Sequence, residues 1–266
     1  MTKLAWVTDI HLNFLGEEEI KYFCTNLLKA NPEVVLITGD ISETPHLEKH
    51  LNLLAENLRI PIYFVLGNHD FYFGEIAQVR QDMTKLTNNS SLLKWIPALG
   101  IVPLSKTTCL VGHDGWGDGR FGNYQNTPVF LNDFLLISDL VVSDSRKLIK
   151  KLNELGDEAA DYLADILPKA LSKYEKVILI THVPPFKETS WHRGNVSDDN
   201  YLPFFSCKAV GEVLYKVMSE HTEKEMLVLC GHTHGVGQAR ILPNLLVKTG
   251  GAIYGKPELQ EIIVAK

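Results

Sequence analysis

Five short apolar runs in this chain are each followed directly by a small polar cluster. The runs cover residues 4–8, 34–38, 61–66, 177–181 and 226–230. Apolar runs of this length are typical of buried strands. The carboxyl ends of parallel strands lie at one edge of a sheet, so polar residues far apart in the sequence are expected to meet there.

The polar clusters carry side chains that bind metal ions. They supply Asp9, His11, Asp40, Asn68, His182, His232 and His234. In an extended chain, residues i and i+2 point the same way, so Asp9 and His11 can bind one ion. Taken singly, the clusters at Asp9–His11 and at Asp40 are commoner as turns, and His182 is commoner as a structural histidine. Together they predict a site of carboxylate, amide and imidazole ligands for two divalent metal ions.

The apolar runs alternate with amphipathic stretches near 17–30, 45–57 and 74–84. This alternation predicts an α/β fold with helices on the outer faces of a sheet. We expect further strands at 108–111, 238–242, 245–248 and 260–264, and a helix near 207–219. An apolar stripe over 148–170 indicates either a core-facing helix, which we favour, or a partner-binding seam.

No linker, repeat or low-complexity tract interrupts the chain, so we expect a single domain over residues 1–266. Two long irregular stretches, near 113–140 and 184–206, are expected to form substrate-facing loops. Loops carried on a rigid scaffold often supply binding residues.

The bulk composition restricts the class of partner. A net charge of −6 argues against an extended nucleic-acid surface, which needs a basic stripe, but it allows a small anionic substrate beside metal ions. No stretch is long and apolar enough to span a membrane. The four cysteines are widely spaced and no secretory signal is evident, so we expect reduced thiols and a cytoplasmic protein. Nothing in the sequence indicates an oligomeric state.

In chain order the clusters read Asp-x-His, Gly-Asp, Gly-Asn-His-Asp, a single His and Gly-His-Thr-His. In this order they resemble the calcineurin-like metallophosphoesterase superfamily. The resemblance implies a four-layer αββα sandwich of two mixed β-sheets flanked by helices. It also implies one metal held by Asp9, His11, Asp40 and His234, and a second held by Asp40, Asn68, His182 and His232. Nitrogen and oxygen ligands without thiolate suit Mn, Fe, Zn, Co or Ni.

The same resemblance implies a metal-dependent phosphoric ester hydrolase. We expect in-line attack on phosphorus by a metal-bound hydroxide, because two metal ions neutralise the phosphate oxygens and lower the pKa of bound water. Asn68 would bind a metal and also contact the phosphate. His69 is expected to be the general acid for the leaving oxygen, with Asp70 orienting its ring.

Candidate substrate contacts are His113, Asp114 and Arg120, in a glycine-rich loop that follows an expected strand. A guanidinium matches the geometry of a phosphate. Arg120 is equally well explained as a solvated surface residue, and His113 and Asp114 as groups that stabilise the loop. His192 and Arg193 are weaker candidates.

The motifs also depart from some branches of the superfamily. The Gly-Asp cluster lacks the Arg-Gly that follows it in Ser/Thr protein phosphatases, and the third cluster ends in Asp70 rather than Glu. These features favour phosphodiester hydrolysis of a small phosphate ester. The alternatives are a phosphomonoesterase or nucleotide pyrophosphatase, and a non-catalytic protein-binding scaffold. Residues 250–256 fit GxxxxGK, but Pro257 stands where a P-loop needs a hydroxyl.

Overall fold

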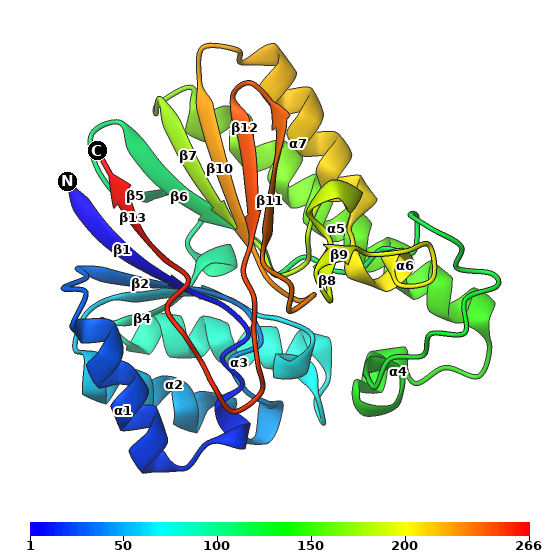
Figure 1. Ribbon diagram of the computed structural model, residues 1–266, viewed down its shortest axis with the longest axis horizontal. Coiled ribbons are helices and arrows are strands. Elements are labelled where there is room, and N and C mark those ends of the chain that lie inside the picture. Colours follow the sequence, from blue (N-terminus) through cyan, green and yellow to red (C-terminus); the bar gives the residue numbers. More distant parts are fainter.

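Two large sheets pack face to face, with helices covering the outer side of each (Figure 1). The computed structural model describes residues 1–266. The first sheet has the strand order β13-β1-β2-β3-β4 and the second has the order β11-β12-β10-β7-β6-β5. Both are mixed, because β13 in the first sheet and β5 and β11 in the second pair antiparallel with parallel neighbours. The expected four-layer sandwich is confirmed.

The elements follow the chain in a strand–helix alternation. The first sheet consists of β1 (Thr2–Val7), β2 (Val34–Thr38), β3 (Ile62–Val65), β4 (Leu93–Trp95) and β13 (Glu261–Ala265). The second consists of β5 (Val102–Pro103), β6 (Thr108–Gly112), β7 (Lys176–Ile180), β10 (Glu225–Cys230), β11 (Gly237–Leu242) and β12 (Leu245–Thr249). The helices are α1 (Glu17–Leu28), α2 (Thr44–Leu58), α3 (Ile76–Asn89), α4 (Asp133–Leu136), α5 (Ser145–Leu171), α6 (Leu202–Phe205) and α7 (Lys208–Glu220). A hairpin of β8 (Trp191–His192) and β9 (Asn195–Val196) forms a separate two-stranded sheet.

The strands are apolar on both faces because each lies between two packed layers. In β1, Leu4 and Trp6 belong to the apolar cluster between the sheets, whereas Ala5 and Val7 belong to the cluster beneath the helices. Successive side chains of a strand point to opposite faces, so a strand that is covered on both sides reads as a continuous apolar run.

Helix α5 uses its apolar stripe for the core, as favoured from the sequence. Leu152, Leu163 and Leu167 are all buried on it, and Leu163 packs in the cluster that joins the second sheet to α5 and α7. The alternative of a partner-binding seam is therefore wrong for this stripe. Gly156 lies in the middle of α5, where an added Cβ would come within 2.5 Å of the Asp118 side chain.

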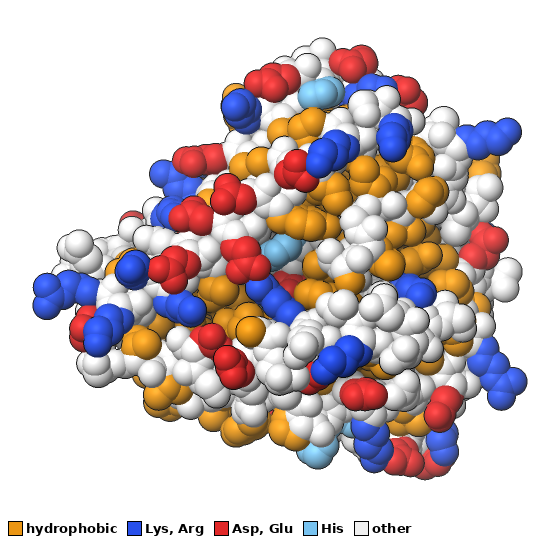
Figure 2. All heavy atoms as spheres, turned by 180° about the vertical axis from the view of Figure 1, so that it is seen from behind, with side chains coloured by type: hydrophobic (Ala, Val, Ile, Leu, Met, Phe, Trp, Pro, Cys, Tyr) orange, Lys and Arg blue, Asp and Glu red, His pale blue; other side chains and the backbone are white.

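The two long loops carry little regular structure. Figure 1 places α4, which lies in the first loop, beside the sandwich rather than against the face of either sheet. No helix has both the length and the apolar character required to cross a bilayer. On the face seen in Figure 2, Lys and Arg side chains are interspersed with Asp and Glu rather than gathered in a stripe.

Candidate metal centre

The polar clusters lie at the carboxyl ends of parallel strands. In the first sheet, β1, β2 and β3 run parallel, and they end just before Asp9, Asp40 and Asn68. In the second sheet, β7 and β10 are parallel neighbours, and they end just before His182 and His232. The two sheets therefore bring their polar ends to a common edge, as the sequence pattern predicts.

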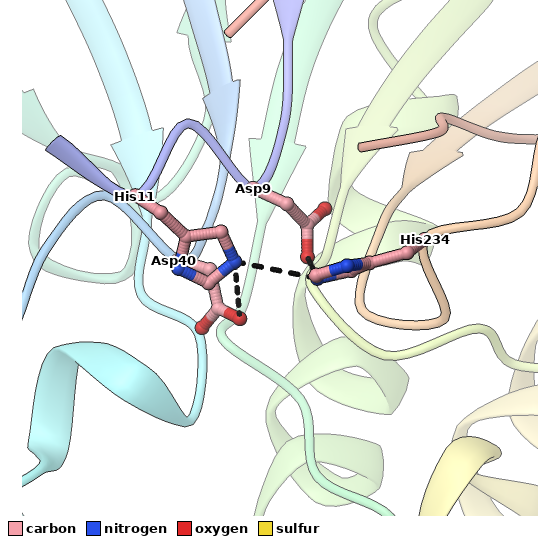
Figure 3. A group of neighbouring side chains, drawn as sticks. All are labelled: Asp9, His11, Asp40 and His234. Atoms are coloured by element: carbon pink, nitrogen blue, oxygen red, sulfur yellow. Dashed lines mark hydrogen bonds and ion pairs between the residues drawn. The ribbon is translucent and has the colours of Figure 1, made fainter. Parts of the chain in front are cut away.

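Asp9, His11, Asp40 and His234 form one compact group. Each offers one ligand atom, and these atoms all lie within 4.8 Å of one another. Figure 3 shows the four side chains directed toward a common point from both sheets. The Nε2 atom of His11 lies 3.7 Å from Asp40 Oδ2 and 3.3 Å from His234 Nε2.

A second group lies beside the first. The Oδ1 atom of Asn68 is 3.1 Å from Nε2 of His182 and 2.9 Å from Nδ1 of His232. His182 Nε2 is also 3.4 Å from Oδ1 of Asp40. Asp40 thus directs Oδ2 toward the first group and Oδ1 toward the second, which is the placement required of a bridging carboxylate.

The charges of these side chains suit a bound cation. Burial lowers the pKa of His232 to about 3 and that of His11 to about 4, so both rings are neutral at pH 7, as metal-binding imidazoles are. Burial disfavours a charge on His182, but the adjacent Asp40 raises its pKa to about 10. A proton on His182 then offsets part of the charge of two buried carboxylates, Asp9 and Asp40. Divalent cations would supply this compensation, so the residues fit the metals that the fold family implies.

The backbone at these positions is unusual. Left-handed φ angles occur at Asp9 (48°), His11 (40°), Asp40 (51°), His232 (70°) and His234 (58°). Such angles are uncommon outside glycine, although Asp and His tolerate them better than most residues. The chain therefore turns sharply as it leaves β1, β2 and β10.

The glycines of the clusters provide room for the ligands. A Cβ on Gly67 would lie 2.1 Å from Oδ1 of Asp40, and a Cβ on Gly231 would lie 2.1 Å from Oδ2 of Asp9. Any larger residue would displace these carboxylates. Close approach, rather than a left-handed φ, explains these two glycines, because neither has one.

Asp70, which was expected to orient the ring of His69, makes its hydrogen bonds to backbone groups instead. Its Oδ1 accepts hydrogen bonds from the backbone N–H groups of Ile41 and Ser42, at 2.9 and 2.8 Å. Its Oδ2 accepts one from Gly67 at 2.8 Å. Both oxygens are occupied, and Asp70 instead ties together the turns that follow β2 and β3.

His69 is oriented by an aromatic neighbour. Its ring stacks on Tyr72, with a centroid distance of 4.3 Å and an interplanar angle of 27°. Its Nε2 lies 4.0 Å from Oδ2 of Asp40, and its buried Nδ1 has no hydrogen-bond partner. The imidazole therefore stands at the edge of the first group of ligands.

Asp133, in the first long loop, supports both Asn68 and Tyr72. One carboxylate oxygen, Oδ1, accepts hydrogen bonds from Asn68 Nδ2 and from the Tyr72 hydroxyl, each at 2.8 Å. Because Nδ2 is directed to Asp133, the Oδ1 atom of Asn68 is turned toward His182 and His232. Burial raises the pKa of the Asp133 carboxyl above its ordinary value, while both donors favour its charged form.

His113 and Asp114 stabilise their loop and do not reach the ligand groups. His113 Nδ1 accepts a hydrogen bond from the backbone of Gly115 at 3.2 Å. Asp114 Oδ1 accepts from the Leu66 backbone at 2.8 Å and from the Trp95 indole at 2.9 Å. Of the two interpretations left open by the sequence, loop stabilisation is the one that the contacts support.

Arg120 is engaged elsewhere and does not line the cavity at the ligand groups, which agrees with the alternative of a surface residue. Its guanidinium donates to Asp118 at 3.0 Å and to both oxygens of Asp157 at 2.8 Å. The weaker candidate His192 does line the cavity beside the ligands, whereas Arg193 does not.

A cavity of about 350 Å³ opens over the ligand groups. Apart from ligands and His69, its walls include Tyr72, Phe130, Asp133, His192, Phe205 and Tyr254. Sequence reasoning missed Tyr72, Asp133 and Tyr254. A signal was available for Tyr254, since it follows β12, which runs parallel to β10 and ends at the same edge.

Comparison with known proteins places the chain in a family. The profile described as calcineurin-like phosphoesterase matches residues 2–236. The chain belongs to that family. This membership agrees with the class of enzyme expected from the sequence, a metal-dependent phosphoric ester hydrolase.

One curated relative resembles part of the chain. It is a transmembrane protein with metallophosphoesterase domain from Danio rerio, 31% identical over 80 residues. That match covers 28% of this chain and only 18% of the relative.

Solved structures share the fold of this chain over most of its length. A dimetal phosphatase from Danio rerio superposes with a TM-score of 0.59 at 14% identity, covering 94% of this chain and 87% of that one. The phosphopantetheinyl hydrolase of Mycobacterium tuberculosis gives 0.64 at 13% identity, covering 94% and 89%. At such low identity these similarities establish the fold alone.

Proposed function

We propose that the protein is a dinuclear metal-dependent phosphoesterase that prefers phosphodiesters. The observation that carries this proposal is the position of Asp40, whose two oxygens face two separate groups of ligands. Asp9, His11, Asp40 and His234 would hold one ion, and Asp40, Asn68, His182 and His232 the other. Bound there, the ions would supply Lewis-acid activation of water and neutralise the phosphate oxygens.

His69 would act as the general acid in this reaction. It lines the cavity, and stacking on Tyr72 fixes its ring plane beside the ligands. A proton held on this ring can be passed to the leaving oxygen as the ester bond breaks. The buried edge of the ring carries Nδ1, so Nε2 is the atom placed to donate.

The lining of the cavity supports a preference for diesters. It includes no lysine or arginine. A phosphomonoester or a pyrophosphate carries more negative charge than a diester, and enzymes that bind such groups commonly pair them with arginine or lysine. Walls that offer no lysine or arginine therefore match a diester, which carries one negative charge.

The test is a screen of metal-reconstituted protein against phosphate mono-, di- and pyrophosphate esters, run with Mn, Fe, Zn, Co and Ni. We expect the highest kcat/KM with a diester. Higher values with monoesters or nucleotide pyrophosphates would favour those alternatives. Inactivity with every metal and ester would favour the non-catalytic scaffold.

Replacing His69 by Ala should lower kcat by about 10²–10⁴-fold, the usual contribution of a general acid. Bound metal should be unchanged, because His69 is outside both ligand groups. An ester with a leaving group that needs no proton should lose less. Metal content and kcat are measured together to distinguish a general acid from a metal ligand. Loss of metal from His69→Ala would mean that His69 is a ligand.

A further inference from the structure

Two exposed aromatic side chains line the cavity. Tyr254 lies in the segment between β12 and β13 that Figure 1 shows crossing from the second sheet to the first. Phe130 lies in the loop that precedes α4. Both line the cavity, yet Tyr254 is 47% and Phe130 is 64% exposed. Large aromatic surface left open beside a binding site commonly marks a contact for a ligand.

Tyr254 lies directly over the first ligand group. Its ring centroid is 4.5 Å from that of His11, 5.0 Å from that of His234 and 6.2 Å from that of His69. Phe14, itself 54% exposed, continues this wall at 5.0 Å from Tyr254. A group attached to a phosphate in the site would therefore meet an aromatic face.

The loop that carries Tyr254 is tied in place. The side-chain amide of Gln260 accepts a hydrogen bond from the N–H of Gly251 and donates one to its carbonyl, at 3.0 and 2.9 Å. The ring of Phe130 packs edge-on against Phe134 at 5.3 Å. Both rings are thus held in position before any substrate binds, which reduces the entropy lost on binding.

We propose that the substrate is a phosphodiester that carries a flat aromatic group, bound against Tyr254 or Phe130. This inference rests on the proposed function and defines its substrate class. Rings in contact favour a planar partner over an aliphatic one, because offset or edge-on packing adds to the effect of buried area. Because the walls of the cavity hold no lysine or arginine, we expect the bound phosphate to carry only one negative charge.

The experiment compares three diesters of equal charge by calorimetric titration of the metal-loaded protein. They are diphenyl, dicyclohexyl and dimethyl phosphate. We expect diphenyl phosphate to bind at least about tenfold more tightly than dimethyl phosphate, the factor given by ~1.4 kcal/mol of ring contact. Dicyclohexyl phosphate should fall between them. Equal affinity for the diphenyl and dicyclohexyl esters would overturn the recognition of a flat ring.

Substitutions of Tyr254 and Phe130 test which ring contacts the aromatic group of the substrate. Tyr254→Ala, Phe130→Ala or both should reduce the diphenyl-to-dimethyl ratio to below about threefold, whereas Tyr254→Phe, which retains the ring, should preserve it. A ratio unchanged in both alanine variants and in their combination would refute the proposal. Metal content is measured for each variant, because Tyr254 packs on two of the ligands.

Charge is tested with phenyl phosphate, a monoester. The wild-type protein should bind it more weakly than diphenyl phosphate. Asn132→Lys places a cation in the wall of the cavity and should reduce this difference in affinity. Tighter binding of phenyl phosphate to the wild type would contradict the limit on charge. If the wild type hydrolyses the esters during the titration, the same ratios are measured in metal-loaded His69→Ala. A protein that hydrolyses no ester would refute the proposed function while leaving these binding ratios measurable.

Discussion

Asp133 influences the site through a single oxygen atom. That atom holds the amide of Asn68 and the hydroxyl of Tyr72, and Tyr72 in turn supports the ring of His69. A candidate ligand and the proposed general acid therefore share one support, which comes from a loop outside all five motifs. Residues that hold ligands in place typically change metal affinity by 10–100-fold when they are lost.

Asp133→Ala should accordingly weaken metal binding by about 10–100-fold, measured by titration of the metal-free protein. Asp133→Asn is the matched control, because one carbonyl oxygen can accept both hydrogen bonds that Oδ1 accepts now. It should remain within a few-fold of the wild type. Similar losses in both variants would indicate that the charge of Asp133, rather than its hydrogen bonds, is what the site requires.

The seven candidate ligands could be predicted because each directly follows a strand of apolar residues. The residues that were missed or misassigned lack this local signal. Tyr254 and Asp133 reach the cavity from loops whose paths depend on tertiary packing. Arg120 suited a phosphate by its chemistry, but Asp157, on α5, lies close enough to bind it. A partner so distant in the sequence cannot be read from the motif.

Among the elements, α5 was the most clearly predicted from sequence, since a long apolar stripe has a readable period. The short strands β4, β5, β8 and β9 have only two or three residues each. A segment of two or three residues is too short to show an alternation of apolar and polar side chains. Its pairing depends on the neighbouring segments and cannot be predicted from its own sequence. Boundaries of the longer strands and helices lie within a few residues of those expected.

Leu163 tests how much α5 contributes to stability. The residue is fully buried between α5 and the second sheet, so Leu163→Ala should lower the free energy of unfolding by about 2–5 kcal/mol. Asp161→Ala, on the exposed side of the same helix, should change it by no more than about 0.5 kcal/mol. Urea unfolding curves measure both. A small effect of Leu163→Ala would mean that the helix relaxes into the space.

At the scale of the whole molecule, the prediction of two sheets depended on the order of the motifs. Periodicity alone indicated helices outside a sheet, and the division of the strands into two sheets came from the resemblance to a family. The reason lies in the central layer. Leu36 and Ile178 pack in one cluster although they belong to different sheets, and nothing local in either strand identifies its partner across the interface.

The four cysteines are all buried and unpaired, which makes the fold sensitive to alkali. Burial raises the pKa of Cys24 to about 11 and those of Cys109 and Cys230 to about 12, from an ordinary value of 9.0. Below pH 9 the folded and unfolded chains both keep these protons. Above it the unfolded chain loses them first, so the free energy of unfolding should fall as pH rises toward 11–12.

Thiol titration checks this expectation. At pH 8 an aromatic disulfide reagent should modify none of the four cysteines in the folded protein and all four in guanidinium. The urea midpoint of unfolding should be lower at pH 10.5 than at pH 8. Rapid modification of the folded protein would show that a thiol is more accessible than its burial indicates.

The left-handed turns at the ligand edge affect the molecule as a whole. Each non-glycine residue held at such an angle costs about 1–3 kcal/mol. His234, with φ at 58°, is only partly buried, so its side chain can be removed with little loss of packing. In chelator, His234→Gly should unfold at higher urea than His234→Ala, by about 1 kcal/mol in free energy. Equal midpoints would mean that the backbone relaxes once the imidazole is gone. A laboratory search for heat-resistant variants that ignores turnover should therefore select glycine substitutions at these five left-handed positions. Each such substitution would remove a candidate metal ligand.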